Sequence, residues 1–583
     1  MPKSNAGPAV GPWNPGLESE IPRELLPLST MFRGDNISND LAEVAELSDF
    51  TGLPRVELVA FRPERLVVHE LLIRVTADLT VPDGPNYEDL GINLRGMVAT
   101  VLEKYARPEM AGLVARFDEL RAQAETAARD LIAEAAAPEP AAADKGGSFL
   151  GRLFSRGKRP APVSPPGDLA EALRALSKRG HGGEPLCSAC LAALVHVAEA
   201  IVGARGRLPA DNDLLVRLAV RRVCNTFGSD MLGKAVEPIF AKACAGEGYR
   251  VLPPQPQPVI MNTKGASASG KSTMRSLQRE LAGRLGVPWE DFALISPDYW
   301  RKFLLDYDSL GEDYKYAAML TGHELEIIDK KLDRYMAEKA QQGRMSHLLI
   351  DRFRFDSFSP EDEREDDVNL LTRFGSTIFL FFVITPPHET VERAWNRGIK
   401  TGRYKAVDDL LFHNVEAFTG MPQLFFSWAL SRRKKVHYEF LDNSVPEGER
   451  PRTIASGWNG HMNVYDLGAM LDIERYRRID IHATTPEEVY REPADADERN
   501  TGFLEACVER MERIEFVDPR SGRVYAVVEN GGWAKRDDAG RRGRTGKILD
   551  SLRLPARPAS TASADGLDTP SLSDEPNYVV GRI

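Results

Sequence analysis

The stretch Val259-Ile-Met-Asn-Thr-Lys-Gly-Ala-Ser-Ala-Ser-Gly-Lys-Ser-Thr273 decides the fold of this chain. Its apolar start, residues 258–263, predicts a buried strand, and residues 271–286 have the periodicity of a helix that ends at a glycine. Between them, residues 265–272 match the pattern GxxxxGK[ST] in full. A strand, a glycine-rich loop and a helix in this order predict a phosphate-binding loop.

The chemistry of this loop follows from its residue types. Glycines let successive N–H groups point inward at a triphosphate, and the positive end of the following helix adds to the attraction. Lys271 is expected to reach the β- and γ-phosphates, and Ser272 to ligate Mg²⁺. The predicted cofactors are ATP and Mg²⁺. The predicted nucleotide-binding residues are Gly265, Ala266, Ser267, Ala268, Ser269, Gly270, Lys271, Ser272 and Thr273. The alternative is a glycine- and serine-rich turn that carries a lysine by chance.

After the loop, strand and helix patterns alternate. Four apolar segments predict further strands: FALIS (292–296), HLLID (347–351), STIFLFFVIT (376–385) and KVHYEFL (435–441). Helical stretches such as residues 324–342 separate them. This alternation predicts a mostly parallel sheet covered on both faces. The expected fold class is α/β, with a P-loop NTPase or kinase core and mainly helical domains before it.

The rest of the chain divides by composition and periodicity. The predicted segments are a loose arm (1–30), a mostly helical domain (31–135), a Pro/Ala/Gly-rich linker (136–167), a second helical segment (168–250), the P-loop domain (251–475), a small α+β region (476–552) and a disordered tail (553–583). In the α+β region, residues 501–518 have a helical pattern and residues 522–533 resemble a hairpin.

Composition and charge fit a cytoplasmic enzyme, and they fit many other soluble proteins of a reducing compartment as well. Of 583 residues, 42% are apolar and 28% charged, as in ordinary globular proteins. The net charge of -11 makes a nucleic-acid partner an unlikely expectation. Five cysteines are too few and too scattered for a disulfide framework. The start of the chain lacks a signal-peptide pattern, and the longest strongly apolar run, residues 378–384, is far shorter than the roughly 18 residues of a membrane span. We therefore expect a cytoplasmic protein.

Two features outside the core suggest partners or metal. Residues 149–159 of the linker combine aromatic and basic side chains, a composition suited to weak contact with an anionic membrane surface, although a solvated linker is favoured. The helical N-terminal half offers a surface for a protein partner. Cys187 and Cys190, flanked by His181 and His196, form a single CxxC, which is a weak zinc signal. Packing of Cys190 in an apolar core is favoured over metal binding.

Carboxylates after the second and third predicted strands narrow the reaction. Asp298, in SPDYW, is placed to accept the proton of an attacking hydroxyl, although an Asp after a strand also starts helices well. Asp351 closes the strand HLLID, and strand ends on this side of a parallel sheet face the ligand crevice. Asp351 would assist Mg²⁺ through water or hold the substrate. The alternative is a cap for the following segment.

Arginines follow in the stretch ETVERAWNRGIKTGRYK. Arg393 and Arg397 lie four residues apart on one helical face, and Arg403 follows in a loop. Arginines on a mobile segment are able to close over phosphates and neutralise charge in the transition state. The alternative is a solvated face on which the arginines pair with Glu389 and Glu392.

Residues 258–445 resemble the zeta-toxin kinases, a branch of P-loop phosphotransferases. The shared features are GASASGKST, SPDYW, the threonine-led helix TGHELEIID, the strand LLID and the ERAWNRG helix followed by an arginine loop. Members of that family transfer the γ-phosphate of ATP to a sugar hydroxyl of a UDP-linked amino sugar. The spacing of the arginine loop differs here, and Asp351 is followed by Arg-Phe-Arg where the family has Gly-Thr.

The resemblance assigns roles to individual residues. Lys271 matches the phosphate-binding lysine and Asp298 the general base, and Arg393 and Arg403 match catalytic arginines. Asp329, eight residues after Thr321, falls where the family has a substrate-binding glutamate, and the predicted substrate-binding residues are Thr321, Asp329 and Asp351. The expected function is an ATP-dependent kinase acting on a hydroxyl of a small molecule. The alternatives are an ATP-gated switch and, because of the RRKK stretch at 432–435, a kinase of nucleic-acid ends.

Overall fold

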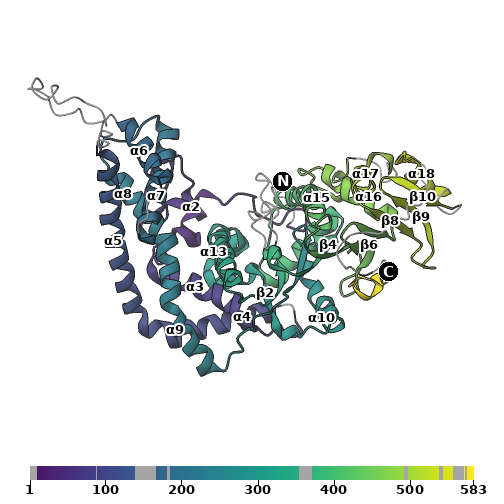
Figure 1. Cartoon of the computed structure of the whole chain (residues 1–583), viewed down its shortest axis with the longest axis horizontal. Helices are drawn as coiled ribbons and strands as arrows, with labels where there is room; N and C mark the ends of the chain where they lie inside the picture. Colours follow the sequence, from purple (N-terminus) through teal and green to yellow (C-terminus); the bar gives the residue numbers. More distant parts are fainter. Residues whose placement is uncertain are drawn as a thin grey trace, which may run out of the picture. The chain divides into compact units, whose positions relative to one another are not determined.

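The computed structural model describes residues 10–86, 88–137, 166–179, 184–352, 371–491, 497–537, 542–555, 570 and 574–583. These form two compact units (Figure 1). The helical unit comprises residues 24–72 and 98–247, and the α/β unit comprises residues 1–23, 73–97 and 248–583. The two helical segments predicted separately therefore belong to one unit. Most of the predicted linker, including its segment 149–159, lies outside the described residues.

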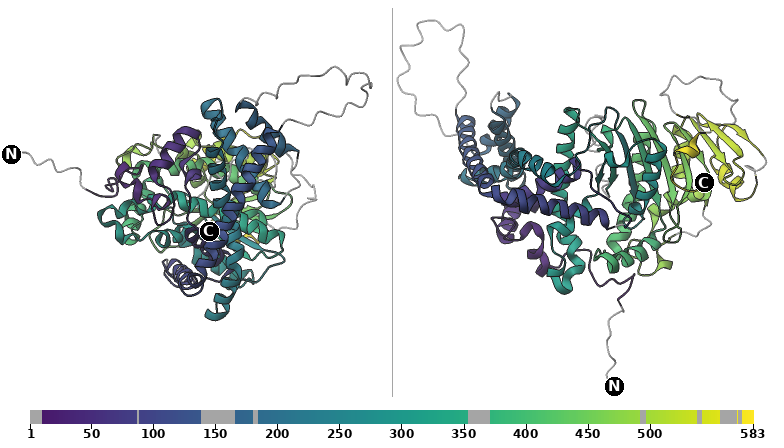
Figure 2. Two further views of the ribbon diagram at one scale, coloured as in Figure 1. Left: turned by 90° about the vertical axis from the view of Figure 1, so that its left-hand side faces the viewer. Right: turned by 90° about the horizontal axis from the view of Figure 1, so that it is seen from below.

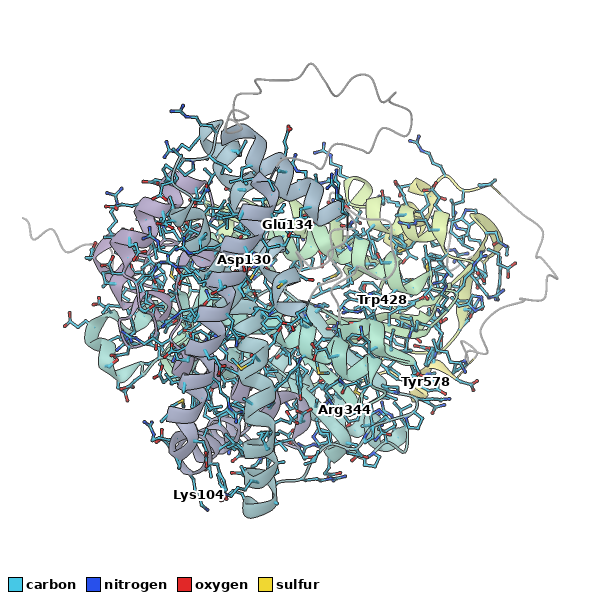
Figure 3. All side chains as sticks on the ribbon, turned by 60° about the vertical axis from the view of Figure 1, so that its left-hand side comes forward. Lys104, Asp130, Glu134, Arg344, Trp428 and Tyr578 are labelled. Carbon is cyan, nitrogen blue, oxygen red and sulfur yellow. The ribbon has the colours of Figure 1, made fainter. Side chains whose placement is uncertain are left out.

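The helical unit is built from amphipathic helices. They are α1 (Leu41–Thr51), α2 (Arg55–Leu58), α5 (Met110–Ala136), α6 (Pro166–Lys178), α7 (Pro185–Arg205), α8 (Asp213–Val223) and α9 (Ser229–Glu247). Helix α5 packs against α6, α7 and α8. It buries apolar residues such as Phe117 and Leu131 and keeps Asp130 and Glu134 on its exposed side (Figure 3). The 3.6-residue spacing of the apolar positions dictates this division.

Helix α7 has the length and the apolar composition of a membrane-spanning helix, and within the described parts of the chain it alone has both. The sequence analysis did not identify this segment as such. In the structure, its residues Cys190, Leu194, Val197 and Ile201 are buried, and the helix packs against α5, α6 and α8.

Residues 73–97 belong to the α/β unit rather than to the helical domain expected over 31–135. The boundary between the two units falls within α3 (Pro63–Asp78) and α4 (Asp89–Thr100). The hydroxyl of Thr76 accepts a hydrogen bond of 3.1 Å from Trp300 Nε1. The carboxylate of Asp78 pairs with Lys339 Nζ at 2.6 Å. Because these partners lie more than 200 residues away in sequence, local periodicity could not assign this stretch to the α/β unit.

The α/β unit contains one ten-stranded sheet with the order β10-β9-β8-β7-β6-β5-β4-β1-β3-β2 (Figures 1 and 2). The strands are β1 (Val259–Gly265), β2 (Phe292–Ile295), β3 (His347–Asp351), β4 (Thr377–Ile384), β5 (Lys435–Asp442), β6 (Arg452–Trp458), β7 (His461–Val464), β8 (Arg513–Val517), β9 (Val524–Glu529) and β10 (Gly532–Arg536). Strands β1 to β5 pair in parallel. The five predicted strands and the α/β class are thus confirmed.

Continuous apolar runs make the central strands suitable for burial on both faces. All residues of β4 from Ile378 to Ile384 are buried, and Phe382 stacks on Phe440 of β5 with ring centroids 4.8 Å apart. Helices α15 (Val407–Ala429) and α16 (Leu467–Arg475) contribute to the same core. This core fixes the edge of the sheet at which β1, β3, β4 and β5 end.

The C-terminal part differs from the prediction. Residues 513–517, expected to continue a helix, form β8, and β8–β10 extend the same sheet rather than a separate region. The predicted hairpin is confirmed as β9 and β10. Strands β6 and β7 were not predicted, although Asn459-Gly460 between them is a hairpin signal and Asn459 has a φ of 44°.

Two predicted loose ends are also partly ordered. In the arm, Trp13 Nε1 donates to Glu392 Oε1 at 3.2 Å, and Lys315 Nζ donates to the carbonyl of Pro15 at 2.8 Å. In the tail, the backbone N–H groups of Val580 and Gly581 each donate at 2.8 Å to the buried carboxylate of Glu439 in β5. A buried carboxylate needs such partners, so polar composition alone was a poor guide here.

Candidate functional site

The predicted phosphate-binding loop lies at the carboxyl end of β1, between β3 and β4 in the sheet. Residues 265–270 connect β1 to a 3₁₀ turn (Lys271–Met274), which continues into α10 (Arg275–Arg284). In open parallel sheets, ligands bind outside the carboxyl ends of the strands. The strand–loop–helix order that the sequence predicts is therefore present where that rule places a ligand.

The backbone of the loop is left-handed at two positions. Ala268 has a φ of 60° and Gly270 a φ of 94°. A left-handed residue next to right-handed ones turns successive N–H groups to one side, which is the geometry of an anion-binding nest. For Ala268 this conformation costs about 1 kcal/mol. Strain of this kind is typical of ligand-binding loops.

Two side chains from the neighbouring strands hold the loop. The carbonyl of Ser269 accepts hydrogen bonds from Thr385 Oγ1 at 2.9 Å and from Asn443 Nδ2 at 2.8 Å. Thr385 directly follows β4 and Asn443 directly follows β5. The sequence analysis did not select either residue. The available signal was that Thr385 ends the predicted strand 376–385 and that Asn443 lies two residues beyond the predicted strand 435–441.

Gly270 is required by both conformation and space. A Cβ atom added there would lie 2.3 Å from Asn443 Nδ2. We expect Gly270→Ala to displace Asn443, remove one of the two donors that hold the carbonyl of Ser269 and weaken binding of an ATP analogue at least tenfold, on the order of one hydrogen bond to a charged phosphate. Gly283→Ala in α10, where an added Cβ meets no atom within 4 Å, is the control. Isothermal titration of both variants checks this, and equal affinities would contradict it.

Lys271 lies inside the loop. Its Nζ donates to the carbonyls of Gly265 at 3.0 Å and Ala266 at 2.8 Å. Burial lowers the pKa of Lys271, and the charges of Asp351 and Asp298 oppose that shift. Both carboxylates therefore act on the same ammonium group. The structure thus brings three of the predicted residues together.

Asp298 lies in the 3₁₀ turn Pro297–Trp300 directly after β2. Its Oδ2 pairs with Arg403 Nη2 at 2.6 Å and its Oδ1 with Arg301 Nε at 3.0 Å. Burial disfavours its ionised form, but the two guanidinium groups outweigh burial and hold the pKa of Asp298 well below its usual range. The side chain is 41% exposed, so the carboxylate is ionised and accessible.

Arg301 was missed by the sequence analysis. Besides Asp298, its guanidinium donates to the hydroxyl of Thr321 at 2.9 Å. Thr321 is fully buried and donates in turn to the carbonyls of Ala317 and Ala318. Thr321 therefore positions Arg301, and through it Asp298, whereas the resemblance implies a substrate-binding role.

The predicted arginines occupy two different places. Arg403, after α14 (Pro387–Thr401), pairs with Asp298, and Arg397 Nε donates to the carbonyl of Arg403 at 3.4 Å. The charge of Arg397 also acts on Lys271 and Asp298. Arg393 instead contacts Glu389 at 2.9 Å and the carbonyl of Asn443 at 2.7 Å. Arg393 thus holds the segment after β5, and Arg397 is the better placed of the two to act on a phosphate.

Asp351 is the last residue of β3 and lies opposite Thr263 of β1. Burial raises its pKa, and the positive charge of Lys271 opposes that shift. Lys264, one residue before the loop, is a second buried ammonium group, and burial lowers its pKa to about 7. Its charge also interacts with that of Asp351, so the charges of two lysines act on this carboxylate.

Asp329 has a different environment from the one that the resemblance implies. Its carboxylate pairs with Arg352 Nη2 at 2.5 Å, and both side chains are less than a tenth exposed. Arg352 also pairs with Asp333 at 2.7 Å. Arg352 is the residue after Asp351, where the chain departs from the zeta-toxin pattern. The residue that departs from the zeta-toxin pattern, Arg352, is therefore the one that pairs with the buried carboxylate of Asp329.

This ion pair predicts a structural role for Asp329, which a stability measurement distinguishes from a role in substrate binding. Asp329→Ala would leave the buried Arg352 without one of its two carboxylate partners, and we expect a loss of about 3–5 kcal/mol in the free energy of unfolding. Glu326→Ala, in the exposed pair with Lys330, should change it by less than about 1 kcal/mol. Urea unfolding measures both. A stable Asp329→Ala variant with weakened substrate affinity would instead support the role implied by the resemblance.

The residues around the loop fit a magnesium–nucleotide complex. Mg²⁺ in such complexes is held by substrate phosphates, water and one or two protein oxygens. Ser272, partly exposed beside Lys271, and Asp351 offer these oxygens. Across the described ranges, no group of three or more His, Cys, Asp or Glu side chains could hold a metal by itself.

Two other predicted features lie elsewhere. Cys190 is buried in α7, with its Sγ 3.7 Å from the carbonyl of Ala124, and His196 pairs with Glu57. His181 lies outside the described residues. The RRKK stretch leads into β5, whose first residue is Lys435, so it is at the amino ends of the parallel strands, on the edge opposite the phosphate-binding loop.

Comparison with known proteins adds no assignment, since no protein-family model, curated protein or solved structure matches the chain.

Proposed function

We propose that the α/β unit is an ATP- and Mg²⁺-dependent kinase with a zeta-toxin-like P-loop core, which phosphorylates a hydroxyl of a small molecule in the cytoplasm. The observation that carries this proposal is the convergence of Lys271, Asp298, Asp351 and Arg403 beside a loop of phosphate-binding sequence. These side chains come from four separate segments at the carboxyl edge of the sheet.

The groups suit phosphoryl transfer. A hydroxyl held between Asp298 and the γ-phosphate would form the new O–P bond while the bond to the leaving ADP oxygen breaks, and its proton would pass to the Asp298 carboxylate. Lys271 would exchange the carbonyls of Gly265 and Ala266 for phosphate oxygens. Arg403 and Arg397 would offset the charge that develops on the transferred group.

The acceptor is the less constrained part of the proposal. The resemblance favours a UDP-linked amino sugar. The buried pair of Arg352 and Asp329 replaces a carboxylate that the family uses for its substrate, so we expect a different mode of acceptor binding. The helical unit is proposed to bind a protein partner.

Incubation of the full chain with γ-labelled ATP and a small-molecule extract tests the proposal. The expected result is a labelled small molecule that forms with the wild-type protein. Binding of ATP with release of phosphate alone would support the nucleotide-gated switch instead. Labelled oligonucleotide ends would support the nucleic-acid kinase, which the position of the RRKK stretch disfavours.

A further inference from the structure

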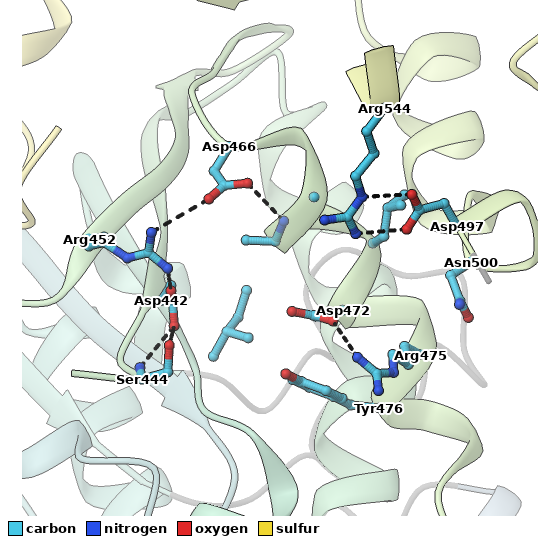
Figure 4. A pocket seen from close by; sticks show the side chains of 14 residues that line it. Asp442, Ser444, Arg452, Asp466, Asp472, Arg475, Tyr476, Asp497, Asn500 and Arg544 are labelled. Carbon is cyan, nitrogen blue, oxygen red and sulfur yellow. Dashed lines mark hydrogen bonds and ion pairs between the residues drawn. The ribbon is translucent and has the colours of Figure 1, made fainter. Parts of the chain in front are cut away.

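A cavity of about 330 Å³ lies in the α/β unit beyond the carboxyl ends of β4 and β5 (Figure 4). Its walls come from β4, β5, β6, α16 and α18 (Gly543–Ser551). Asp442 and Asp472 approach it from opposite sides, and Tyr476, Asn500 and Arg544 are among the other polar residues of its lining. None of these residues belongs to the proposed kinase site.

Most of the charges in the lining are already paired. Asp442 pairs with Arg452, and Asp497 accepts two hydrogen bonds from Arg544, at 2.7 and 2.8 Å. Asp466 accepts from the backbone N–H of Ala469 at 3.0 Å. Asp472 lies 3.6 Å from Arg475, beyond hydrogen-bond distance. The cavity therefore combines satisfied ion pairs with the carboxyl of Asp472, which interacts with Tyr476 and lies beyond hydrogen-bond distance of Arg475.

This lining selects a class of ligand. The four aspartates would repel a phosphate or a carboxylate, and the three arginines would oppose a polyvalent cation. A hydroxyl both donates and accepts, so it is able to bridge neighbouring carboxylates and guanidinium groups. Leu471, Ile384 and Tyr476 add an apolar side suited to the face of a sugar ring. The volume is at the lower end of the roughly 300–1,000 Å³ of small-ligand pockets.

Two residues link the cavity to the phosphate-binding loop, and each of them directly follows a lining residue in the sequence. Ile384 and Asp442 line the cavity, and the next residues in the chain, Thr385 and Asn443, both donate to the carbonyl of Ser269. A ligand that shifts the ends of β4 and β5 would therefore shift the loop. By linkage, nucleotide binding would change affinity at the cavity by the same factor.

We propose that this cavity binds a small neutral polyhydroxy compound of monosaccharide size and that its occupation changes the affinity of the phosphate-binding loop for nucleotide. The coupling rests on the proposed function, whereas the binding does not.

Saturation-transfer NMR on the full chain tests the binding without nucleotide. The probes are glucose, N-acetylglucosamine, ribose and myo-inositol, with spermidine and inorganic phosphate as the charged alternatives, the latter followed by ³¹P line width. We expect at least one polyhydroxy probe to bind, and Asp472→Ala to weaken it about tenfold, as for a lost hydrogen bond to a charged group. Glu509→Ala on the exposed face of α17 (Gly502–Arg510) is the control.

Arg544→Met provides a second variant at a side chain that is 63% exposed, so its effect does not depend on the folding of Asp472→Ala. Binding of spermidine or phosphate alone, or equal binding by all variants, would overturn the site. The coupling predicts that the bound polyhydroxy probe changes the affinity for an ATP analogue about fivefold or more. An unchanged affinity for the ATP analogue would overturn the coupling but not the binding site. Lys271→Ala should bind the polyhydroxy probe normally even if it binds no nucleotide.

Discussion

Replacing Lys271 by Ala is expected to abolish phosphoryl transfer and to weaken binding of an ATP analogue about 100-fold or more. The ammonium group lies within the curve of the loop, where it would exchange two carbonyl contacts for two phosphate oxygens. Hydrogen bonds to charged groups contribute about 1.5–3 kcal/mol each, so loss of two accounts for this factor. Isothermal titration and transfer of labelled phosphate measure the two effects separately.

The melting temperature of Lys271→Ala shows whether transfer is lost through the missing ammonium group or through unfolding. Burial lowers the pKa of Lys271, which means that its charged form is less favourable in the folded protein than in the unfolded chain. We therefore expect Lys271→Ala to melt at the same temperature as the wild type or slightly higher. Lys330→Ala, at an exposed position of α13 (Gly322–Gln341), should leave transfer unchanged. Transfer above half the wild-type rate in Lys271→Ala would refute the role of the loop.

The sequence predicted those features that depend on neighbouring residues in the chain. The apolar runs of β1 to β5 predict buried strands without knowledge of their surroundings. The loop motif predicts the loop conformation from its own residues. Asp298 and Asp351 were found because they end or follow such strands. In each case, a local pattern and the rule for parallel sheets were sufficient.

The residues that were missed, or were given another role, depend on partners that are distant in the sequence. Arg301 donates to the hydroxyl of Thr321, 20 residues further along the chain and directly before α13, and this contact holds the guanidinium beside Asp298. Asp329 is occupied by Arg352, 23 residues away. Asn443 supports a loop 174 residues before it. No periodicity or spacing encodes these contacts, because they form only when the sheet brings the strand ends together.

Replacing Asp298 by Asn is the sharpest test of the reaction itself. The amide has nearly the shape of the carboxylate but does not accept a proton, so we expect transfer to fall about 10²–10⁴-fold, the range for loss of a general base. ATP binding depends chiefly on the loop and should change less than about threefold, within the scatter of a surface change. Asp408→Asn, in the exposed first turn of α15, is the control and should leave both unchanged.

The pH dependence of the wild type distinguishes Asp298 from Asp351 as the base. Arg403 and Arg301 hold the pKa of Asp298 far below its usual range. Its ion pairs therefore stabilise the fold above about pH 4, the pKa in an unfolded chain, and are lost only at still lower pH. Transfer that depends on Asp298 should show no fall between pH 8 and pH 5. Burial raises the pKa of Asp351, so a fall in transfer within that range, absent in Asp351→Asn, would assign the proton to Asp351 and leave Asp298 as an anchor for Arg403.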